Sequence, residues 1–376
     1  MDKQEEIPMK TLLKNNNRFH IYNLKKMVFI SFCITIVVLF AGCYFINNNT
    51  AKNDVNTNQK MIESKAKKVF KVGIVLSIGG LGDKSYNDLA YQGVQLAAKN
   101  LGIEYDYIEP STNIDSEVKL GANHLRQYAK ENYDLVIATG FLFKDACEQV
   151  AKEYPNIKFV IIDSITDAPN ITGLVFKSEE GSFLVGSVAG LVTKTNTIGY
   201  IGAQNTAIFK NFQEGYEQGI GVVNSKAKVI TKYVDGSNPF LVPDRGYELA
   251  NELIDQGADV IYTVAGATGI GAIEACKNRE VYAIGVDNDQ DYIQKGTVIT
   301  SMVKRVDKAV YDSIELAVNG KLEPGILEFG VANGGVDTSE FLYTKSQLPT
   351  GAFEKIDQIK RAIINGEIKI KIDSTS

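Results

Sequence analysis

From residue 69 onward the chain alternates between short apolar runs and longer segments with helical periodicity. Runs that are apolar throughout are separated by stretches in which apolar residues recur every three or four positions. This alternation is typical of parallel strands covered by helices on both faces of a sheet. In the first half we expect strands at 69–77, 103–108, 134–139 and 157–162, with helices at 86–100, 115–131 and from 144.

The cycle restarts after a long helix of small residues around 178–194. The expected strands of the second half are 197–201, 228–234, 259–264, 281–286 and 298–303, with helices at 209–222, 244–256, 270–277 and 307–318 and a short strand near 326–329. Two similar α/β halves indicate two lobes with a cleft between them, and the late elements indicate repeated crossings. We expect lobe 1 to contain 69–175 and about 287–322, and lobe 2 to contain 176–286 and about 323–370.

The N-terminal region has a different texture. Residues 27–46 carry no charge and follow Lys25 and Lys26, which is the pattern of an export signal. Within this run, the letters FAGC at 40–43 resemble a bacterial lipoprotein cleavage box, which predicts that Cys43 is lipidated. An uncleaved helical anchor is the alternative, since twenty apolar residues are enough to cross a bilayer. We therefore treat 1–46 as a signal or anchor segment and the polar stretch 47–68 as a flexible tether.

Charge and composition narrow the partners. The 376 residues contain 40 Lys+Arg and 45 Asp+Glu, and residues 1–68 are basic overall while the rest is strongly acidic. Such an acidic body does not suit a nucleic-acid partner. Only two histidines are present, and the four cysteines form no C-x-x-C pair. We expect no metal, no cofactor and no disulfide framework.

Polar residues cluster where the first predicted strand ends. Asp83, Ser85 and Asn87 follow a glycine-rich turn and would lie at the start of a helix. Helix capping would need only one of them, so a polar recognition edge is the functional interpretation. The segment is not a phosphate-binding loop, because Lys84-Ser85 follows an acid rather than a glycine.

Aromatic residues follow several other strands. Phe141 follows the third strand of the first half, and Asp163 follows the fourth. In the second half, Phe209 and Phe240 follow the first and second strands. Taken singly, such rings are core or hinge residues more often than ligand contacts. Several at equivalent places favour a cleft for a flat, uncharged heterocycle with polar edges.

A glycine-rich segment late in the second half offers a competing interpretation. The letters VAGATGIG at 264–271, with Asp287 at the end of the following strand, are similar to a dinucleotide-binding fingerprint. The late position of this segment and the lack of a hydride-transfer acid or base argue against an NAD-dependent oxidoreductase. A carboxylate at a strand end can still accept two hydrogen bonds from a vicinal diol, which indicates ribose.

Seven segments in this order resemble the basic membrane protein family of nucleoside-binding lipoproteins, the solute-binding components of ABC importers. They are GDKSYN (82–87), ATGF (138–141), SEEGSFLVGSVAGL (178–191), DQGADVIYTVAGATGIG (255–271), YAIGVDNDQ (282–290), TSMVKRVDKAVYD (300–312) and NGGVD (333–337). The resemblance covers about 69–370 and implies a type I periplasmic-binding-protein fold with two Rossmann-like lobes, parallel sheets and a hinged interlobe cleft.

The resemblance also implies roles for individual residues. Asp83 and Asn87 would bind the edge of the base, with Ser85 and Tyr86 shaping that wall. Phe141 and Phe209 would pack on the base. Asp163 would add a polar contact, Gly266 a backbone contact, Asp287 would hold the ribose hydroxyls, and Lys304 would bind a ribose oxygen or pair with Asp287. The family's Gly-Ser-Phe appears here as GSNPF at 236–240, which leaves open whether Asn238 or Phe240 faces the ligand.

The expected function is therefore capture of a nucleoside, with purine nucleosides favoured, and its delivery to an ABC permease and ATPase. The expected protein is a monomer without catalytic activity, lipid-anchored on the outer face of the cell membrane. A ligand-sensing surface receptor without transport is the first alternative, and the oxidoreductase is the second. Sequence does not separate the receptor from the transport component.

Overall fold

The structure is a computed structural model that describes residues 68–109 and 114–373. The expected signal or anchor segment 1–46, its Cys43 and the tether 47–68 fall almost entirely outside the described residues. The body beginning at Val69 is one compact unit. Among the described helices, none combines the length and apolarity that a membrane crossing requires.

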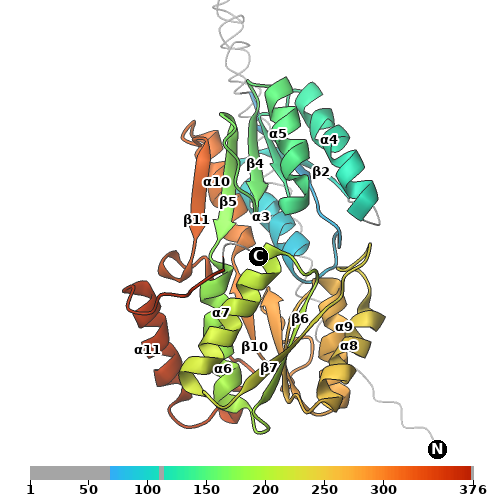
Figure 1. Ribbon diagram of the computed structural model, residues 1–376. Coiled ribbons are helices and arrows are strands. Elements are labelled where there is room, and N and C mark those ends of the chain that lie inside the picture. Colours follow the sequence, from blue (N-terminus) through green and yellow to red (C-terminus); the bar gives the residue numbers. More distant parts are fainter. Residues whose placement is uncertain (1–67, 110–113, 374–376) are drawn as a thin grey trace, which may run out of the picture. The chain divides into compact units, whose positions relative to one another are not determined.

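The body contains two six-stranded sheets, one in each lobe (Figure 1). The first has the order β11-β5-β4-β3-β1-β2, and all of its pairs are parallel. Its strands are β1 Lys71–Val75, β2 Glu104–Ile108, β3 Leu135–Ala138, β4 Lys158–Ile162, β5 Ile171–Phe176 and β11 Gly325–Phe329. Central strands such as β3 are buried along their whole length, as expected for a sheet covered on both faces.

The second sheet has the order β12-β10-β9-β8-β6-β7, in which only the edge pair β10–β12 is antiparallel. Its strands are β6 Thr197–Gly202, β7 Lys228–Tyr233, β8 Val260–Val264, β9 Tyr282–Asp287, β10 Val298–Lys304 and β12 Val336–Thr338. Together the two sheets and their covering helices form the expected type I periplasmic-binding-protein fold.

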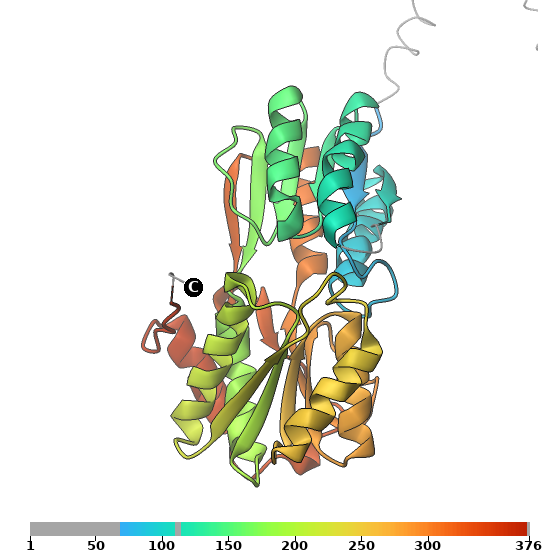
Figure 2. The same cartoon turned by 45° about the vertical axis from the view of Figure 1, so that its right-hand side comes forward.

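Helices cover both faces of each sheet. In lobe 1, α3 Tyr86–Leu101 packs with α10 Val306–Val318, while α4 Ile114–Lys130 packs with α5 Lys144–Glu153. In lobe 2, the sheet lies between the pair α6–α7 and the pair α8–α9 (Figure 2). These helices are α6 Ser178–Val192, α7 Ala207–Val223, α8 Pro243–Asp255 and α9 Ala267–Asn278, and the last helix is α11 Ala352–Ile364.

The division of the chain between lobes differs from the expectation at two strands. We expected β10 in lobe 1 and β11 in lobe 2, but β10 pairs with β9 in the second sheet and β11 pairs with β5 in the first. The reason is that the chain crosses directly after each of these strands rather than before it. The helix α10 follows the expected assignment to lobe 1, because it packs on α3, and β12 follows the expected assignment to lobe 2, because it pairs with β10.

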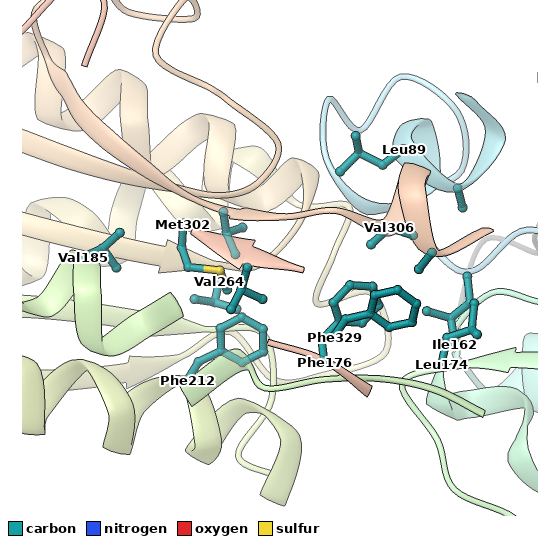
Figure 3. Packing of buried hydrophobic residues seen from close by; sticks show 14 of the residues in the cluster. Leu89, Ile162, Leu174, Phe176, Val185, Phe212, Val264, Met302, Val306 and Phe329 are labelled. Carbon is teal, nitrogen blue, oxygen red and sulfur yellow. The ribbon is translucent and has the colours of Figure 1, made fainter. Parts of the chain in front are cut away.

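Three crossings join the lobes side by side. They follow Phe176, Lys304 and Phe329, the last residues of β5, β10 and β11. The amide of Lys177 donates to the carbonyl of Phe329 at 2.8 Å. The rings of Phe176 and Phe329 stack with centroids 5.1 Å apart, and Figure 3 shows them together in the middle of the shared core. One apolar cluster therefore runs from lobe 1 into lobe 2 through the crossings.

Candidate functional site

A cavity lies where the carboxyl ends of the strands of both sheets face one another. In open α/β sheets this edge is where ligands bind. The lining residues are Ser77, Ile78, Gly79, Asp83, Tyr86, Asn87, Gly140, Phe141, Leu142, Asp163, Ile208, Phe209, Phe212, Phe240, Val264, Ala265, Gly266, Val286, Asp287 and Lys304. Of the twelve residues predicted from the sequence to contact the ligand, ten are in this set.

The other two nominated residues stand outside it. Ser85 is fully buried behind the cavity wall, where its hydroxyl donates to Oδ2 of Asp287 at 2.6 Å. Asn238 does not line the cavity, whereas Phe240, two residues later, does. Phe240 is thus the one of the two that lines the cavity, and its contact with a ligand stays a prediction.

The lobe 1 wall is built around the carboxylate of Asp83. This side chain is 2% exposed and accepts hydrogen bonds from the backbone amides of Ser85 and Asn87, each at 2.9 Å. It also accepts the amide of Asp88 at 3.3 Å and the side-chain amide of Asn87 at 3.0 Å. Burial nevertheless outweighs these bonds and raises the pKa of Asp83 to about 6. Asp83 therefore fixes the start of α3 and holds Asn87 in place.

Asn87 extends the same network to the first strand. Its Oδ1 accepts the backbone amide of Ser77 at 2.9 Å, directly after β1. The turn between them contains Gly79, whose φ of +114° a residue with a side chain rarely adopts. The polar groups of this wall are consequently bonded to one another before any ligand is considered.

The lobe 2 wall is aromatic. The ring of Phe209 on α7 lies 6.0 Å from that of Phe240 and, across the cavity, 6.3 Å from that of Phe141 in an edge-to-face arrangement. Phe240 packs against the backbone of Gly266, where an added Cβ would lie 3.6 Å from Phe240 atoms. Rings from both lobes thus line the cavity and give an aromatic ligand apolar surfaces against which to pack.

Asp287 ends β9 with a φ of +64°. Its side chain is 8% exposed, and burial raises its pKa above the usual value, although Lys304 and the bond from Ser85 oppose that shift. Only Oδ2 of its two carboxylate oxygens accepts the hydrogen bond from the hydroxyl of Ser85. Because a carboxylate has about four acceptor positions, capacity for further hydrogen-bond donors remains.

Lys304, the last residue of β10, is the cation of the cavity. Its Nζ lies 2.5 Å from Oδ2 of Asp163, with the two side chains 2% and 9% exposed. It also lies 4.9 Å from the ring centre of Tyr86 and 4.8 Å from that of Phe176. The proposed pairing of Lys304 with Asp287 is therefore replaced by an ion pair with Asp163, which comes from the opposite lobe.

Tyr86 is buried beside this ion pair. Its hydroxyl makes no hydrogen bond of normal geometry within the described residues. Burial, together with the nearby charge of Asp163, raises its pKa well above the usual value. Tyr86 therefore stays protonated and forms an uncharged part of the cavity wall beside Asp163.

Sequence reasoning missed Ser77 and Phe212, which also line the cavity. Ser77 follows the first strand, so the strand-end rule could have found it. Phe212 comes one helical turn after Phe209 on α7, so its position in the helical period was the available signal.

The glycines of 264–271 are used for packing. A Cβ on Gly271 would lie 1.9 Å from the carbonyl oxygen of Pro243 on α8, and one on Gly269 would lie 2.6 Å from Oγ1 of Thr263. These contacts bring α9 close to α8 and to the sheet. They account for the glycine pattern without a dinucleotide. No cluster of three or more His, Cys, Asp or Glu side chains suited to a metal occurs within 68–109 and 114–373.

A cavity between two α/β lobes that are joined by three crossings is the arrangement typical of two-lobe ligand-binding proteins. Residues 70–374 match the family described as ABC transporter substrate-binding protein PnrA-like, and the chain belongs to that family. The family is one of substrate-binding proteins, and the solved structures of similar fold include solute-binding proteins of ABC transporters.

Individual relatives agree along nearly the whole chain. The chain is 31% identical over 363 residues to a CD4+ T-cell-stimulating antigen of Listeria monocytogenes, covering 90% of this chain and 98% of that one. It is 31% identical over 373 residues to the ABC transporter nucleoside-binding protein BmpA of Lactococcus lactis, covering 92% and 99%. An ABC transporter solute-binding protein from Aeropyrum pernix has a TM-score of 0.72 and 27% identity, covering 81% and 94%.

Proposed function

We propose that this protein captures a nucleoside in the interlobe cavity and delivers it to an ABC permease and its ATPase. The observation that carries the proposal is the carboxylate of Asp287, which faces an aromatic cavity and keeps acceptor capacity for a vicinal diol. The name of the Lactococcus lactis relative supports the same ligand class.

The rings favour a purine nucleoside. Phe141, Phe209, Phe212 and Phe240 provide apolar surface on both sides of the cavity, and a bicyclic base would cover more of it than a pyrimidine. Asp83 and Asn87 would meet the edge of the base, with Tyr86 beside them. On this proposal Asp163 acts mainly by holding Lys304, and Gly266 and the backbone near it complete the wall.

Charge favours a nucleoside over a nucleotide. Asp83, Asp163 and Asp287 line the cavity together with one cation, Lys304, which is already paired. A phosphate would therefore meet an excess of negative charge in a desolvated site. Because the cavity is complete within one chain, we propose that the protein acts as a monomer.

Anchoring belongs to the same proposal. We propose that Cys43 is lipidated and holds the body on the outer face of the cell membrane. Pyrococcus relatives named as lipoproteins support this location. Mass spectrometry of the membrane-extracted protein tests it, since an acylated Cys43 would then be the first residue.

Asp287→Ala provides the main test. We expect affinity for a purine ribonucleoside to fall about 100-fold, because two hydrogen bonds to a charged acceptor are lost. Affinity for the 2′,3′-dideoxy analogue should change much less. Isothermal titration of both ligands measures the difference.

Asp235→Asn is the matched control, because Asp235 also has a left-handed backbone, with φ of +51°, after a strand of lobe 2 but is exposed. Equal losses for the two ligands in Asp287→Ala would remove Asp287 from the ribose role. A 5′-monophosphate that binds as tightly as its nucleoside would contradict the charge argument.

A further inference from the structure

Gln290 is a buried polar residue that does not line the cavity. It is 2% exposed and lies three residues after Asp287, in the loop that follows β9. A carboxamide buried to this extent must satisfy its donors and its acceptor within the protein. The partners of Gln290 therefore show what its side chain does.

The carboxamide of Gln290 bonds to both lobes. On its own lobe, Oε1 accepts the backbone amide of Val286 at 3.1 Å, directly before Asp287. From lobe 1, the carbonyl oxygen of Lys84 accepts a hydrogen bond from Nε2 at 3.2 Å. One end of a single planar group thus holds the Asp287 turn, and the other end holds the turn that carries Ser85.

The backbone of Gln290 is itself fixed by a buried network. Its amide donates to Oγ of Ser301 at 3.0 Å. Asp291 accepts the hydroxyls of Ser301 and Ser339, each at 2.8 Å, and is 1% exposed. β9 also leaves room for the side chain at Gly285, where an added Cβ would lie 2.8 Å from Oε1 of Gln290. Gln290 therefore has little freedom to point elsewhere.

The two turns that Gln290 joins are the ones that meet at the cleft. Lys84 and Asp287 both have left-handed backbones, with φ of +54° and +64°. Between them, Ser85 donates to Asp287 at 2.6 Å. The bridge through Gln290 thus lies beside the direct contact between the lobes.

We propose that Gln290 is a positioning residue with two separable actions. Its Oε1 orients Asp287 by holding the amide of Val286, and its Nε2 stabilises the closed arrangement of the lobes by bonding to Lys84. The assignment of Asp287 to the ribose diol rests on the proposed function, whereas the bridge itself rests on the contacts alone.

Two substitutions separate these actions. Gln290→Met removes both hydrogen bonds, whereas Gln290→Glu keeps an acceptor for Val286 and removes the donor toward Lys84. Gln256→Glu is the matched control, because the side-chain amide of Gln256 also donates to a backbone carbonyl, that of Glu252, at 2.9 Å. Unlike Gln290, Gln256 is exposed and lies at the end of α8. Wild type and the three variants are titrated at pH 8 with a ribonucleoside and its 2′,3′-dideoxy analogue.

The expected results differ for each variant. Gln290→Glu should lower the affinity for both ligands about fivefold and leave the ratio of the two affinities unchanged. Stopped-flow measurements should show that most of the loss comes from faster dissociation. Gln290→Met should lower the affinity for the ribonucleoside at least tenfold and the affinity for the dideoxy analogue less. The ratio of the two affinities should therefore become smaller than in wild type. Gln256→Glu should match wild type in both respects. Equal affinities and dissociation rates in all four proteins would overturn the proposal.

Amide hydrogen exchange gives a readout that requires no ligand. Since Gln290 is the acceptor for the amide of Val286, exchange at Val286 should be faster in Gln290→Met than in Gln290→Glu or wild type. Unchanged exchange at Val286 would overturn the positioning action. If wild type binds no nucleoside while Val286 behaves as expected, the proposed function fails and the bridge stands.

Discussion

The two walls of the cavity satisfy their polar groups in different ways. On lobe 1, Asp83, Asn87 and Ser77 bond to one another and to their own backbone. On lobe 2, the side chains of Asp287 and Lys304 find their partners in Ser85 and Asp163, across the cleft. The part of lobe 1 around Asp83 is therefore preorganised, whereas Asp287, Lys304 and the Asp163 that pairs with Lys304 depend on the lobes being together.

The ion pair across the cleft should give the largest effect. Lys304→Met leaves the carboxylate of Asp163 buried without its cation, so we expect the free energy of unfolding to fall by about 3 kcal/mol. Urea denaturation measures this loss. The double variant Lys304→Met with Asp163→Asn should recover part of it, because no unpaired charge remains. A double variant less stable than the single one would contradict this account.

The preorganised wall is tested through Asp83 and pH. Its folded-state pKa of about 6 lies above the ordinary 3.8, so folding favours the protonated acid. The stabilising contribution is thus full below about pH 4 and is lost as the pH rises through 6. The free energy of unfolding of wild type minus that of Asp83→Asn should decline by up to about 3 kcal/mol from pH 4 to pH 7.

Denaturant unfolding at several pH values measures this difference. Asp88→Asn is the control, since Asp88 accepts the amides of Gly82 and Lys84 in the same turn but does not line the cavity. A difference that stays level, or rises with pH, would show that the hydrogen bonds to Asp83 outweigh its burial.

The smallest effect is expected at the direct contact between the walls. Ser85→Ala removes one hydrogen bond to Asp287, so ligand affinity should fall about fivefold with little change in the stability of the ligand-free protein. Calorimetric titration measures the change. Tighter binding by Ser85→Ala would mean that the hydroxyl competes with the ligand for Asp287.

Local pattern was enough to predict most elements of the body. The alternation of buried runs and helical periods placed β1 to β4 and β6 to β11 within a few residues, and the ends of these strands carry most of the cavity lining. The strand β5 was missed because its run, ITGLVF, contains Thr172 and Gly173 and is separated from the small-residue helix α6 by only one residue. The helix α11 also lay beyond the elements predicted.

The pairing of strands and side chains that are far apart in the sequence could not be predicted from the same local pattern. The sheet that β10 or β11 joins depends on where the chain crosses between lobes, and a short apolar run does not encode this choice. Likewise, Lys304 and Asp163 are 141 positions apart, so their pairing followed only from the fold. The roles of Asp83 and Lys304 came from the family resemblance rather than from spacing.

The late return of β11 to the first sheet has a consequence for biogenesis. Lobe 1 begins at Lys71 but lacks its edge strand until Gly325–Phe329 has joined β5. A chain that is threaded through a membrane pore from its N-terminus could not complete this lobe before almost all of it had passed. Under the export that we propose, this late completion disfavours compaction of the chain before it has crossed the membrane.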